Sequence, residues 1–317
     1  MWKTLPRPFY VLAPMDDVTD MVFRQVVAEC AAPDVYVTEF TNIDGMLSVG
    51  AKAVMHRLRT SPLRQKPLVA QLWGTDPDKF YEATKLAVKM GFEGFDINMG
   101  CPVKKIIKND ACSGLIGKYE RVAAIIAATK KGAGTLPVSV KTRLGIKTIQ
   151  TEEWIGFLLE QQLDALIIHG RTVAEMSEVP AHWDEIGKAV QLRNKLGSPT
   201  LIIGNGDVLS KVDGMQKYTE YGVDGIMIGR GIFKNLYVFD GEKDFATFPR
   251  KEKLEHLLKH LTLFHETWGA TKHFAIMKKF YKIYVSGFDE ASELRMKLME
   301  FNTAQETIDF LHDRVDK

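Results

Sequence analysis

The sequence predicts an α/β protein, with a (β/α)8 or TIM barrel at residues 1–243 and a small all-helical domain at residues 244–317. Apolar, β-branched runs alternate with amphipathic helical stretches along the first part of the chain, which is typical of parallel strands joined by helical crossovers. These runs number eight, and a (β/α)8 barrel typically takes about 250 residues. An open doubly wound sheet is the alternative, but it usually has fewer strands.

The predicted elements follow one another along the chain. The eight predicted strands are Tyr10–Pro14, Val35–Phe40, Leu68–Trp73, Phe95–Met99, Pro137–Lys141, Ala165–His169, Thr200–Ile203 and Gly225–Ile228. Helical spacing is clearest at Asp78–Met90 and Glu120–Lys131. After a linker at Lys243–Pro249, apolar residues recur at helical spacing at Leu254, Leu257, Leu258, Leu261 and Phe264. A capping box, Thr303-Ala304-Gln305-Glu306, predicts the start of the last helix.

Composition describes an ordinary globular protein, with 45% hydrophobic residues, 26% charged residues and a net charge of +2. This charge does not by itself indicate nucleic-acid binding, so the distribution of charge matters more. Residues 250–285 carry eight Lys and Arg against three Glu, whereas residues 286–317 carry four against eight acidic residues. A helix over Lys272–Tyr284 would place its aromatic residues on one side and Lys272, Lys278, Lys279 and Lys282 on the other.

Three cysteines, Cys30, Cys101 and Cys112, show no metal-ligand spacing and form an odd set, so we expect reduced thiols and no bound metal. The N-terminal residues lack the apolar core of a signal peptide, and no apolar run is long enough to cross a bilayer. We therefore expect a cytoplasmic protein with no membrane contact, and one that works as a monomer.

Chemically useful side chains, most of them polar, stand at the carboxyl end of every predicted strand, where barrel enzymes build their active sites. In chain order they are Met15 with Asp16, Glu39, Gln71, Asn98 with Cys101, Lys141 with Arg143, His169 with Arg171, Asn205 with Asp207, and Arg230.

Two glycine-rich loops predict a phosphate site. Gly204-Asn205-Gly206-Asp207 follows the seventh strand, and Gly229-Arg230-Gly231 follows the eighth. Glycines let backbone N–H groups approach an anion closely, and barrels commonly bind phosphate at these two loops. Arg230 adds a charge-assisted hydrogen-bond donor.

The fifth strand carries Lys141 and Arg143, which face the same way because strand side chains alternate. Two such cations suit a ring that gains negative charge on reduction, such as a flavin, and Gln71 and His169 would lie level with them. The alternative is that Lys141 forms a Schiff base.

Cys101 lies at the turn that ends the fourth strand, within Asn98-Met99-Gly100-Cys101-Pro102. Nucleophile, metal ligand and general acid are the possible roles, and the lack of ligand spacing disfavours a metal. A thiol with a pKa near 8.5 is mostly protonated at neutral pH, so Cys101 could give a proton to a carbanion. Cys30 and Cys112 are interpreted as small buried apolar residues.

Six motifs in order resemble the tRNA-dihydrouridine synthase family. They are Ala13-Pro14-Met15, the segment 98–102, Val140-Lys141-Thr142-Arg143-Leu144-Gly145, His169-Gly170-Arg171-Thr172, and the two glycine-rich loops. The resemblance spans residues 10–239 and continues more weakly to Glu293-Leu294-Arg295. One departure is Ala111-Cys112-Ser113-Gly114, where the family usually has Ala-Gly-Ser or Ala-Gly-Ala.

This resemblance implies an FMN enzyme that uses NADPH to reduce a uridine of tRNA to 5,6-dihydrouridine. By position, Cys101 would protonate C5 after hydride reaches C6. The residues that would hold the cofactor are Pro14, Met15, Gln71, Lys141, His169, Asn205, Asp207, Gly229 and Arg230. Asn98 and Arg143 would lie near the base, and the basic face with Lys278, Lys279 and Lys282 would contact the RNA backbone.

Two other functions stay open from the sequence. One is a flavin oxidoreductase that acts on a free pyrimidine, similar to the dihydroorotate dehydrogenases. The other is an RNA-binding protein with an inert barrel. The lysine-rich helical region disfavours the first, and the presence of Cys101, Lys141 and His169 disfavours the second.

Overall fold

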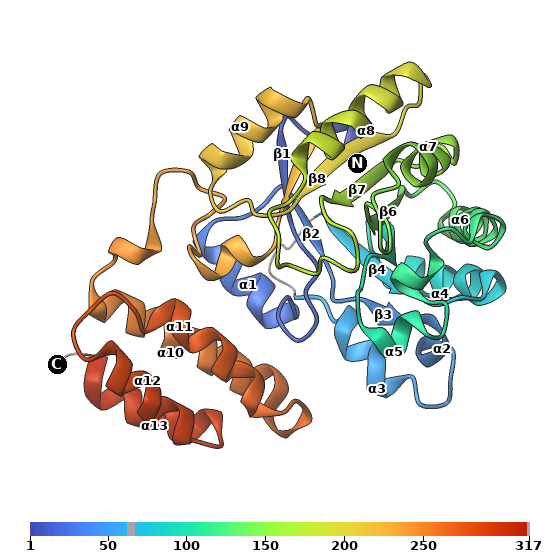
Figure 1. The fold of residues 1–317 in the computed structure, drawn as a ribbon. Coiled ribbons are helices and arrows are strands. Elements are labelled where there is room, and N and C mark those ends of the chain that lie inside the picture. Colours follow the sequence, from blue (N-terminus) through green and yellow to red (C-terminus); the bar gives the residue numbers. More distant parts are fainter. Residues whose placement is uncertain (62–66, 316–317) are drawn as a thin grey trace.

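A closed barrel of eight parallel strands forms the larger part of the molecule, as the sequence predicts (Figure 1). The computed structural model describes residues 1–61 and 67–315. The sheet order is β2-β1-β9-β8-β7-β6-β5-β4, and pairing of β2 with β4 at Tyr36–Leu68 and Val37–Val69 closes the ring. A short additional strand, β3, pairs with the end of β4.

All eight predicted strands are confirmed. Their bounds are β1 Phe9–Leu12, β2 Val35–Val37, β4 Leu68–Trp73, β5 Gly94–Met99, β6 Val138–Arg143, β7 Ala165–His169, β8 Leu201–Asn205 and β9 Gly225–Ile228. The extra strand, β3 Thr41–Asn42, was not predicted, because two residues carry no periodicity.

Helices surround the barrel and make up the C-terminal part of the chain. Their bounds are α1 Met21–Cys30, α2 Ile43–Met46, α3 Lys52–Met55, α4 Pro77–Lys89, α5 Lys104–Ile107, α6 Tyr119–Ala133, α7 Gly156–Glu160, α8 Trp183–Lys195, α9 Lys211–Tyr221, α10 Arg250–Trp268, α11 Tyr281–Tyr284, α12 Ala291–Glu300 and α13 Ala304–Val315. The two helices predicted around residues 78–90 and 120–131 are α4 and α6.

The start of α4 shows how the local sequence sets a helix boundary. Asp76 caps the helix by accepting hydrogen bonds from the N–H groups of Asp78 and Lys79, and Pro77 occupies the first turn, where no N–H is needed. On the facing helix, a Cβ at Gly132 would lie 2.7 Å from the carbonyl oxygen of Tyr81. Glycine at this position therefore allows α4 and α6 to pack closely.

The barrel interior is a packed apolar core rather than a channel. Inward-facing side chains come from alternate strand positions: Phe9, Val11, Val35, Val37, Val69, Ala165, Ile167, Ile203 and Met227. Trp2, in a short 3-10 helix before β1, is 1% exposed and belongs to this cluster. We infer that it covers the amino-terminal end of the barrel, which leaves the carboxyl end open for a site.

The C-terminal helices lie beside the barrel next to α1 (Figure 1). Across this contact the ring of Phe23 in α1 lies 4.8 Å from the ring of Phe280. The capping box before α13 is confirmed, because Thr303 Oγ1 accepts from Glu306 N while Glu306 Oε2 accepts from Thr303 N. The boundary after residue 243 stays a prediction. None of the described helices is long and apolar enough to cross a membrane.

The single helix predicted over Lys272–Tyr284 is wrong in two respects. Residues Phe274–Phe280 form a 3-10 helix that leads into α11. Phe274, Met277 and Phe280 are spaced by three residues, which is the repeat of a 3-10 helix, and all are buried. Lys272 is 9% exposed rather than part of an exposed basic face. The predicted linker at 243–249 contains a short 3-10 helix, Phe245–Thr247.

Candidate active site

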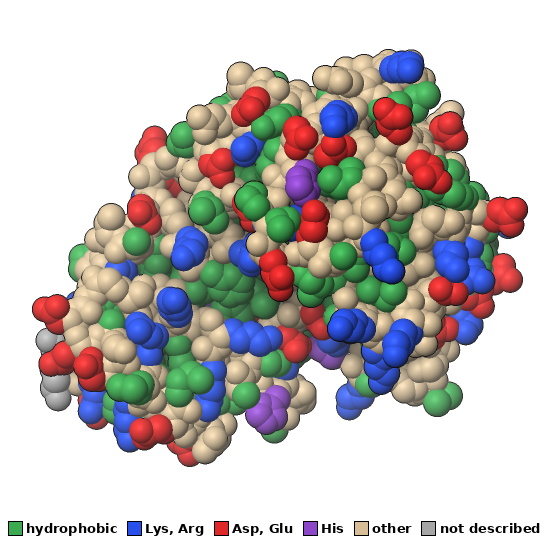
Figure 2. Space-filling view, in the orientation of Figure 1, with side chains coloured by type: hydrophobic (Ala, Val, Ile, Leu, Met, Phe, Trp, Pro, Cys, Tyr) green, Lys and Arg blue, Asp and Glu red, His purple; other side chains and the backbone are tan. Residues whose placement is uncertain are grey.

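A cavity of about 440 Å³ opens at the carboxyl end of the barrel strands. It brings together Pro14, Met15, Lys141, Arg143, His169, Asn205, Asp207, Gly229 and Arg230, which are nine of the predicted site residues. Figure 2 shows a hollow between the barrel face and the C-terminal helices, with Lys and Arg side chains around it. A site of this size suits a small-molecule ligand.

Positive charge dominates this cavity. Its cations are Lys141, Arg143, Arg171, Arg230 and Lys234, and its single carboxylate is that of Asp207. Lys141 Nζ donates to Asn205 Oδ1 at 3.1 Å, and Asn205 is fixed because its Nδ2 donates to the carbonyl of Met227 at 2.9 Å. Burial, with help from Arg143, lowers the pKa of Lys141 to about 8, so most of it stays charged at neutral pH. The cavity is therefore suited to an anionic ligand.

The two glycine-rich loops meet at one end of the cavity. Gly206 has a φ of +133°, and a Cβ there would lie 2.6 Å from Ala181 Cβ. At Gly229 a Cβ would meet only Ala13 Cβ at 3.5 Å and Met15 Sδ at 3.9 Å, and Gly229 itself lines the cavity. The missing side chain at Gly229 thus leaves backbone accessible to a ligand.

Asp207 organises the arginines at this end. Its carboxylate accepts hydrogen bonds from Arg171 and Arg230, and from Ala181 N at 2.9 Å. The pKa of Asp207 is lowered by these donors and cations against the opposing effect of burial. The carboxylate therefore holds cations in place rather than facing a bound anion. Arg171, which is 2% exposed, was not assigned a role from the sequence.

His169 is held as a neutral imidazole. Burial and the surrounding cations Lys141, Arg143 and Arg171 strongly lower its pKa. Arg171 Nη1 lies 3.1 Å from His169 Nε2, so this nitrogen is the acceptor and Nδ1 carries the proton. A neutral histidine at this place can donate one hydrogen bond to a ligand without adding charge.

Arg143 ties two loops together at the cavity wall. Its Nε donates to the carbonyl of Gly100 at 3.0 Å, and its Nη1 donates to the carbonyls of Thr172 and Met176 at 2.9 and 3.0 Å. The turn that carries Cys101 is thereby attached to the loop after β7.

Gln71 and Asn98 do not line the cavity but form a buried hydrogen-bonded chain behind it. Gln71 Nε2 donates to Asp96 at 2.7 Å, and Gln71 Oε1 accepts from Asn98 at 2.9 Å. Asn98 Oδ1 then accepts from the N–H groups of Gly100 and Cys101, both at 3.0 Å. These two side chains shape the turn at Cys101 and have few groups left for a ligand.

Cys101 contacts Cys112, a partner that the sequence interpretation missed. The S–H of Cys112 donates a hydrogen bond to the sulfur of Cys101, which lowers the pKa of Cys101 to about 7 although burial acts in the opposite direction. The same contact and burial raise the pKa of Cys112. Ser113 Oγ also donates to the carbonyl of Cys101 at 2.7 Å and holds the two segments together. Cys101 is therefore less protonated at neutral pH than an ordinary thiol.

The three lysines predicted to contact RNA lie outside the cavity on the C-terminal segment. Lys279 and Lys282 are exposed, and Lys279 Nζ lies 4.0 Å from the carboxylate of Asp17. Lys278 is partly buried and donates to the carbonyl of Met299 at 2.6 Å. Two of the three are therefore presented to solvent as the sequence predicts.

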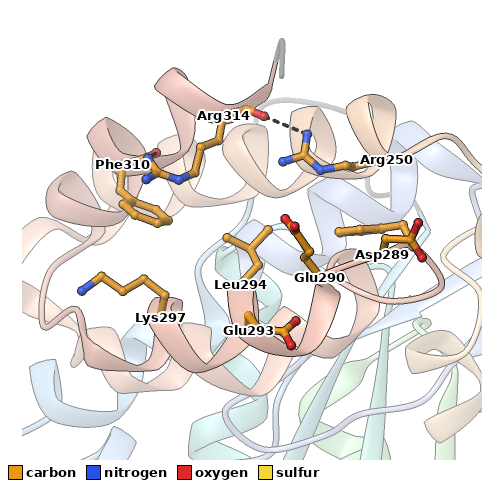
Figure 3. Close-up of a pocket in the computed structure, with 9 residues that line it drawn as sticks. Arg250, Asp289, Glu290, Glu293, Leu294, Lys297, Phe310 and Arg314 are labelled. Atoms are coloured by element: carbon orange, nitrogen blue, oxygen red, sulfur yellow. Dashed lines mark hydrogen bonds between the residues drawn. The ribbon is translucent and has the colours of Figure 1, made fainter.

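A larger hollow of about 550 Å³ lies within the C-terminal helices (Figure 3). It is lined by Asp289, Glu290 and Glu293 as well as by Arg250, Lys297 and Arg314. Arg250 is bonded to the carbonyl of Arg314 at 2.8 Å, and the Arg314 guanidinium lies 3.8 Å from the centre of the Phe310 ring. Its charges balance and none of the predicted site residues lines it, whereas nine line the barrel cavity, so the barrel cavity is the better candidate.

The described residues contain one group of three carboxylates whose oxygens lie within 4.8 Å of one another: Asp16, Asp17 and Glu39. Each of them faces a cation, because Arg57, Lys279 and Lys272 lie 2.9, 4.0 and 3.8 Å away, respectively. These contacts make the group a set of ion pairs beside the cavity rather than a ready metal site.

Comparison with known proteins identifies relatives along the whole chain. A family profile described as Dihydrouridine synthase (Dus) matches residues 11–317. A protein of Staphylococcus epidermidis named "Probable tRNA-dihydrouridine synthase" is 46% identical over 321 residues, covering 99% of this chain and 97% of that protein. "Probable tRNA-dihydrouridine synthase 2" of Bacillus subtilis is 43% identical over 315 residues, covering 98% and 95%.

Solved structures with low sequence identity share the fold. A 2-naphthoyl-CoA reductase complex matches with a TM-score of 0.59 at 10% identity, over 76% of this chain and 52% of that one. Histamine dehydrogenase from Rhizobium sp. 4-9 matches with a TM-score of 0.56 at 12% identity, over 80% and 48%. The chain thus spans about half the length of these two structures.

Proposed function

The chain belongs to the dihydrouridine synthase family, and on this premise we propose that it reduces the 5,6 double bond of a uridine in tRNA, with FMN as cofactor and NADPH as reductant. The observation that carries this proposal is the cationic cavity at the carboxyl end of the barrel, with Cys101 at its side. A tRNA substrate would place the reaction in the cytoplasm.

The residues of the cavity fit FMN. Five cations against one carboxylate match a phosphate together with a ring that becomes anionic on reduction. The open backbone at Gly229, next to Arg230, would hold the phosphate, and Lys141 with neutral His169 would face the ring. When bound, the flavin supplies the hydride that goes to C6 of the uracil.

Cys101 would supply the proton. Its turn adjoins the cavity, because Arg143, which lines the cavity, donates to the carbonyl of Gly100, the residue before Cys101. With a pKa of about 7, the thiol is close to the value at which a general acid works best near neutral pH. Cys101 would give this proton to C5 of the base, where negative charge develops as hydride adds to C6.

The C-terminal helical segment would hold the RNA. A uridine must leave its base stack to reach the cavity, which costs a few kcal/mol that contacts elsewhere must offset. Recognition of folded RNA rests largely on shape and on phosphate contacts. The exposed Lys279 and Lys282 offer such contacts, and Lys278 would add one if it leaves the carbonyl of Met299.

An anaerobic two-step experiment tests the function. The flavin of the purified protein is reduced with NADPH, and tRNA from cells that lack this enzyme is then added while visible absorbance is followed. Rapid return of the oxidised spectrum is the expected result, and orotate and free uridine serve as controls. A flavin that tRNA leaves reduced but orotate oxidises would favour a free pyrimidine as substrate. A protein that binds no flavin would refute the proposal.

A further inference from the structure

Glu39 is a strand-end residue for which the proposed reaction has no direct use. It follows β2, is 0% exposed, and its Oε1 accepts a hydrogen bond from Asp17 N at 2.6 Å. Its Oε2 has no hydrogen-bond partner among the described residues, and Lys272 Nζ lies 3.8 Å from it. Burial raises the pKa of Glu39 to about 7, and Lys272 opposes that rise. A carboxyl group buried at such a cost calls for a structural or functional reason.

Lys272 comes from the C-terminal segment and lies between two carboxyl groups of the barrel part, those of Asp20 and Glu39. Its Nζ donates to Asp20 Oδ2 at 2.9 Å, and Trp268 Nε1 donates to the same oxygen at 2.9 Å. The other oxygen of Asp20 caps α1 through Phe23 N. Lys272 is therefore anchored to the barrel, with Glu39 as its second anionic neighbour.

The loop between β1 and α1 is the element that these contacts control. Met15 in this loop lines the cavity, and Met15 N donates to Thr19 Oγ1 at 2.8 Å. Asp17, two residues later, is held by Glu39 through its N–H, and its carbonyl accepts from Lys279 Nζ at 3.3 Å. The cavity wall and the C-terminal segment thus meet at one loop.

We propose that Glu39 and Lys272 form a positioning pair that fixes the C-terminal helices relative to the loop of Met15, so that RNA bound to those helices presents its uridine to the cavity. This inference rests on the proposed function. Glu39 does not touch the reacting atoms in this scheme. It acts through Asp17 on one side and through Lys272 on the other, which are 255 residues apart in the chain.

Two properties make this pair better placed than other contacts between the two parts. Glu39 and Lys272 are both buried, so solvent screens their interaction weakly. They adjoin a loop that lines the cavity. By contrast, the ion pair between Glu29 Oε2 and Lys259 Nζ, 2.6 Å apart, joins α1 to α10 with side chains that are 32% and 58% exposed. Neither residue lines the cavity. The exposed pair is therefore a matched control.

The test compares Glu39→Gln with Glu29→Gln in the full-length holoenzyme. Glutamine keeps an acceptor for Asp17 N but removes the charge that faces Lys272. For Glu39→Gln we expect KM for tRNA to rise about tenfold, the scale of a coupled buried pair, while the rate of flavin reduction by NADPH stays unchanged. For Glu29→Gln we expect KM within about twofold of the wild type.

A double variant separates positioning from loss of structure. Lys272→Gln also removes the contact with Asp20, so if Glu39 acts through Lys272, Glu39→Gln combined with Lys272→Gln raises KM no further than Lys272→Gln alone. Should Glu39→Gln fail to unfold cooperatively on heating, Lys272→Gln tests the same pair from the C-terminal side. An unchanged KM in a folded variant of either residue overturns the inference. Failure of the wild-type protein to pass electrons to tRNA would instead overturn the proposed function, so the two failures are distinct.

Discussion

Replacing Cys112 by Ala should move the pH profile of uridine reduction towards alkaline pH. In the structure the S–H of Cys112 lowers the pKa of Cys101 to about 7 by donating to its sulfur, while burial acts in the opposite direction. Alanine removes the Cys112 donor and leaves burial, which raises the pKa, together with the N–H of Val103 and the charge of Arg143, which lower it less. The pKa of Cys101 should therefore rise towards the ordinary thiol value of about 8.5.

The size of the effect follows from the protonated fraction of Cys101. A general acid with a pKa of about 7 is about nine-tenths protonated at pH 6 and about one-tenth protonated at pH 8, so the wild-type rate should fall roughly tenfold over this interval. With a pKa of about 8.5 the thiol is still about three-quarters protonated at pH 8. The Cys112→Ala variant should then lose less than about half its rate between pH 6 and pH 8.

The assay is single-turnover oxidation of the NADPH-reduced enzyme by saturating tRNA under anaerobic conditions from pH 6 to pH 9. Alkylation of Cys101 by iodoacetamide over the same range reports its thiolate directly, without catalysis. Cys30→Ala is the control, because Cys30 pairs with Tyr237 in the structure and lines no part of the candidate cavity. An alkaline limb at the same pH in Cys112→Ala and wild type would refute the role of Cys112. A wild-type rate independent of pH between 6 and 8 would refute Cys101 as the acid.

Three further variants test the remaining parts of the site. Cys101→Ala should retain flavin, seen in its visible spectrum, and slow single-turnover uridine reduction by roughly two to four orders of magnitude; a near-normal rate would exclude it as the proton donor. Arg230→Met should weaken FMN binding at least tenfold in a fluorescence titration, because it removes a charge-assisted donor. Thermal unfolding of the apoprotein should stay unchanged, because the Arg230 side chain is 61% exposed. Lys279→Ala combined with Lys282→Ala should weaken tRNA binding and reduce the slope of log K against log salt by roughly one to two, and an unchanged slope would place the RNA elsewhere.

The barrel could be predicted because its signals are local. Each barrel strand, of three to six residues, carries its own apolar run, and the alternation with helices fixes parallel pairing. The elements that escaped prediction are short or depend on distant partners. Strand β3 has two residues, and the 3-10 helix at Phe274–Phe280 shares its apolar residues with an α-helical pattern. Lys272 was assigned to a solvent-facing surface because its partner, Asp20, lies 252 residues earlier in the chain.

The grouping of candidate residues at one cavity could be predicted from their places along the sequence, whereas their roles stay predictions. Six of these residues line one cavity because all lie at or just after the carboxyl ends of strands of the same parallel sheet: Lys141, Arg143, His169, Asn205, Asp207 and Arg230. The contact between Cys101 and Cys112 could not be derived, since it depends on how the chain between them folds back. The only sequence signal is that two cysteines flank the short helix α5, at Lys104–Ile107.

Gln71 and Asn98 show why residue type alone leaves a role open. A side-chain amide can bind a ligand, or it can connect other groups in a buried hydrogen-bonded chain. The number of its donors and acceptors that the protein already uses decides between these two roles. Here Asp96 accepts hydrogen bonds from Ser139 Oγ at 2.6 Å and from Gln71. Asn98 donates to Gln71 and so connects these buried groups to the turn. Burial raises the pKa of Asp96 to about 6, and the two donors counteract that rise.

This chain links β6 through β5 and β4 to the N–H of Cys101, so the place of the sulfur is set by three strands rather than by the turn alone. Arg143 holds the same turn from the other side through the carbonyl of Gly100. A thiol that must meet one carbon of a base gains from such fixed placement, because a misplacement of about 1 Å can cost a hundredfold in rate. Buried polar groups at the end of β5 are therefore better explained as supports for Cys101 than as groups that recognise the base.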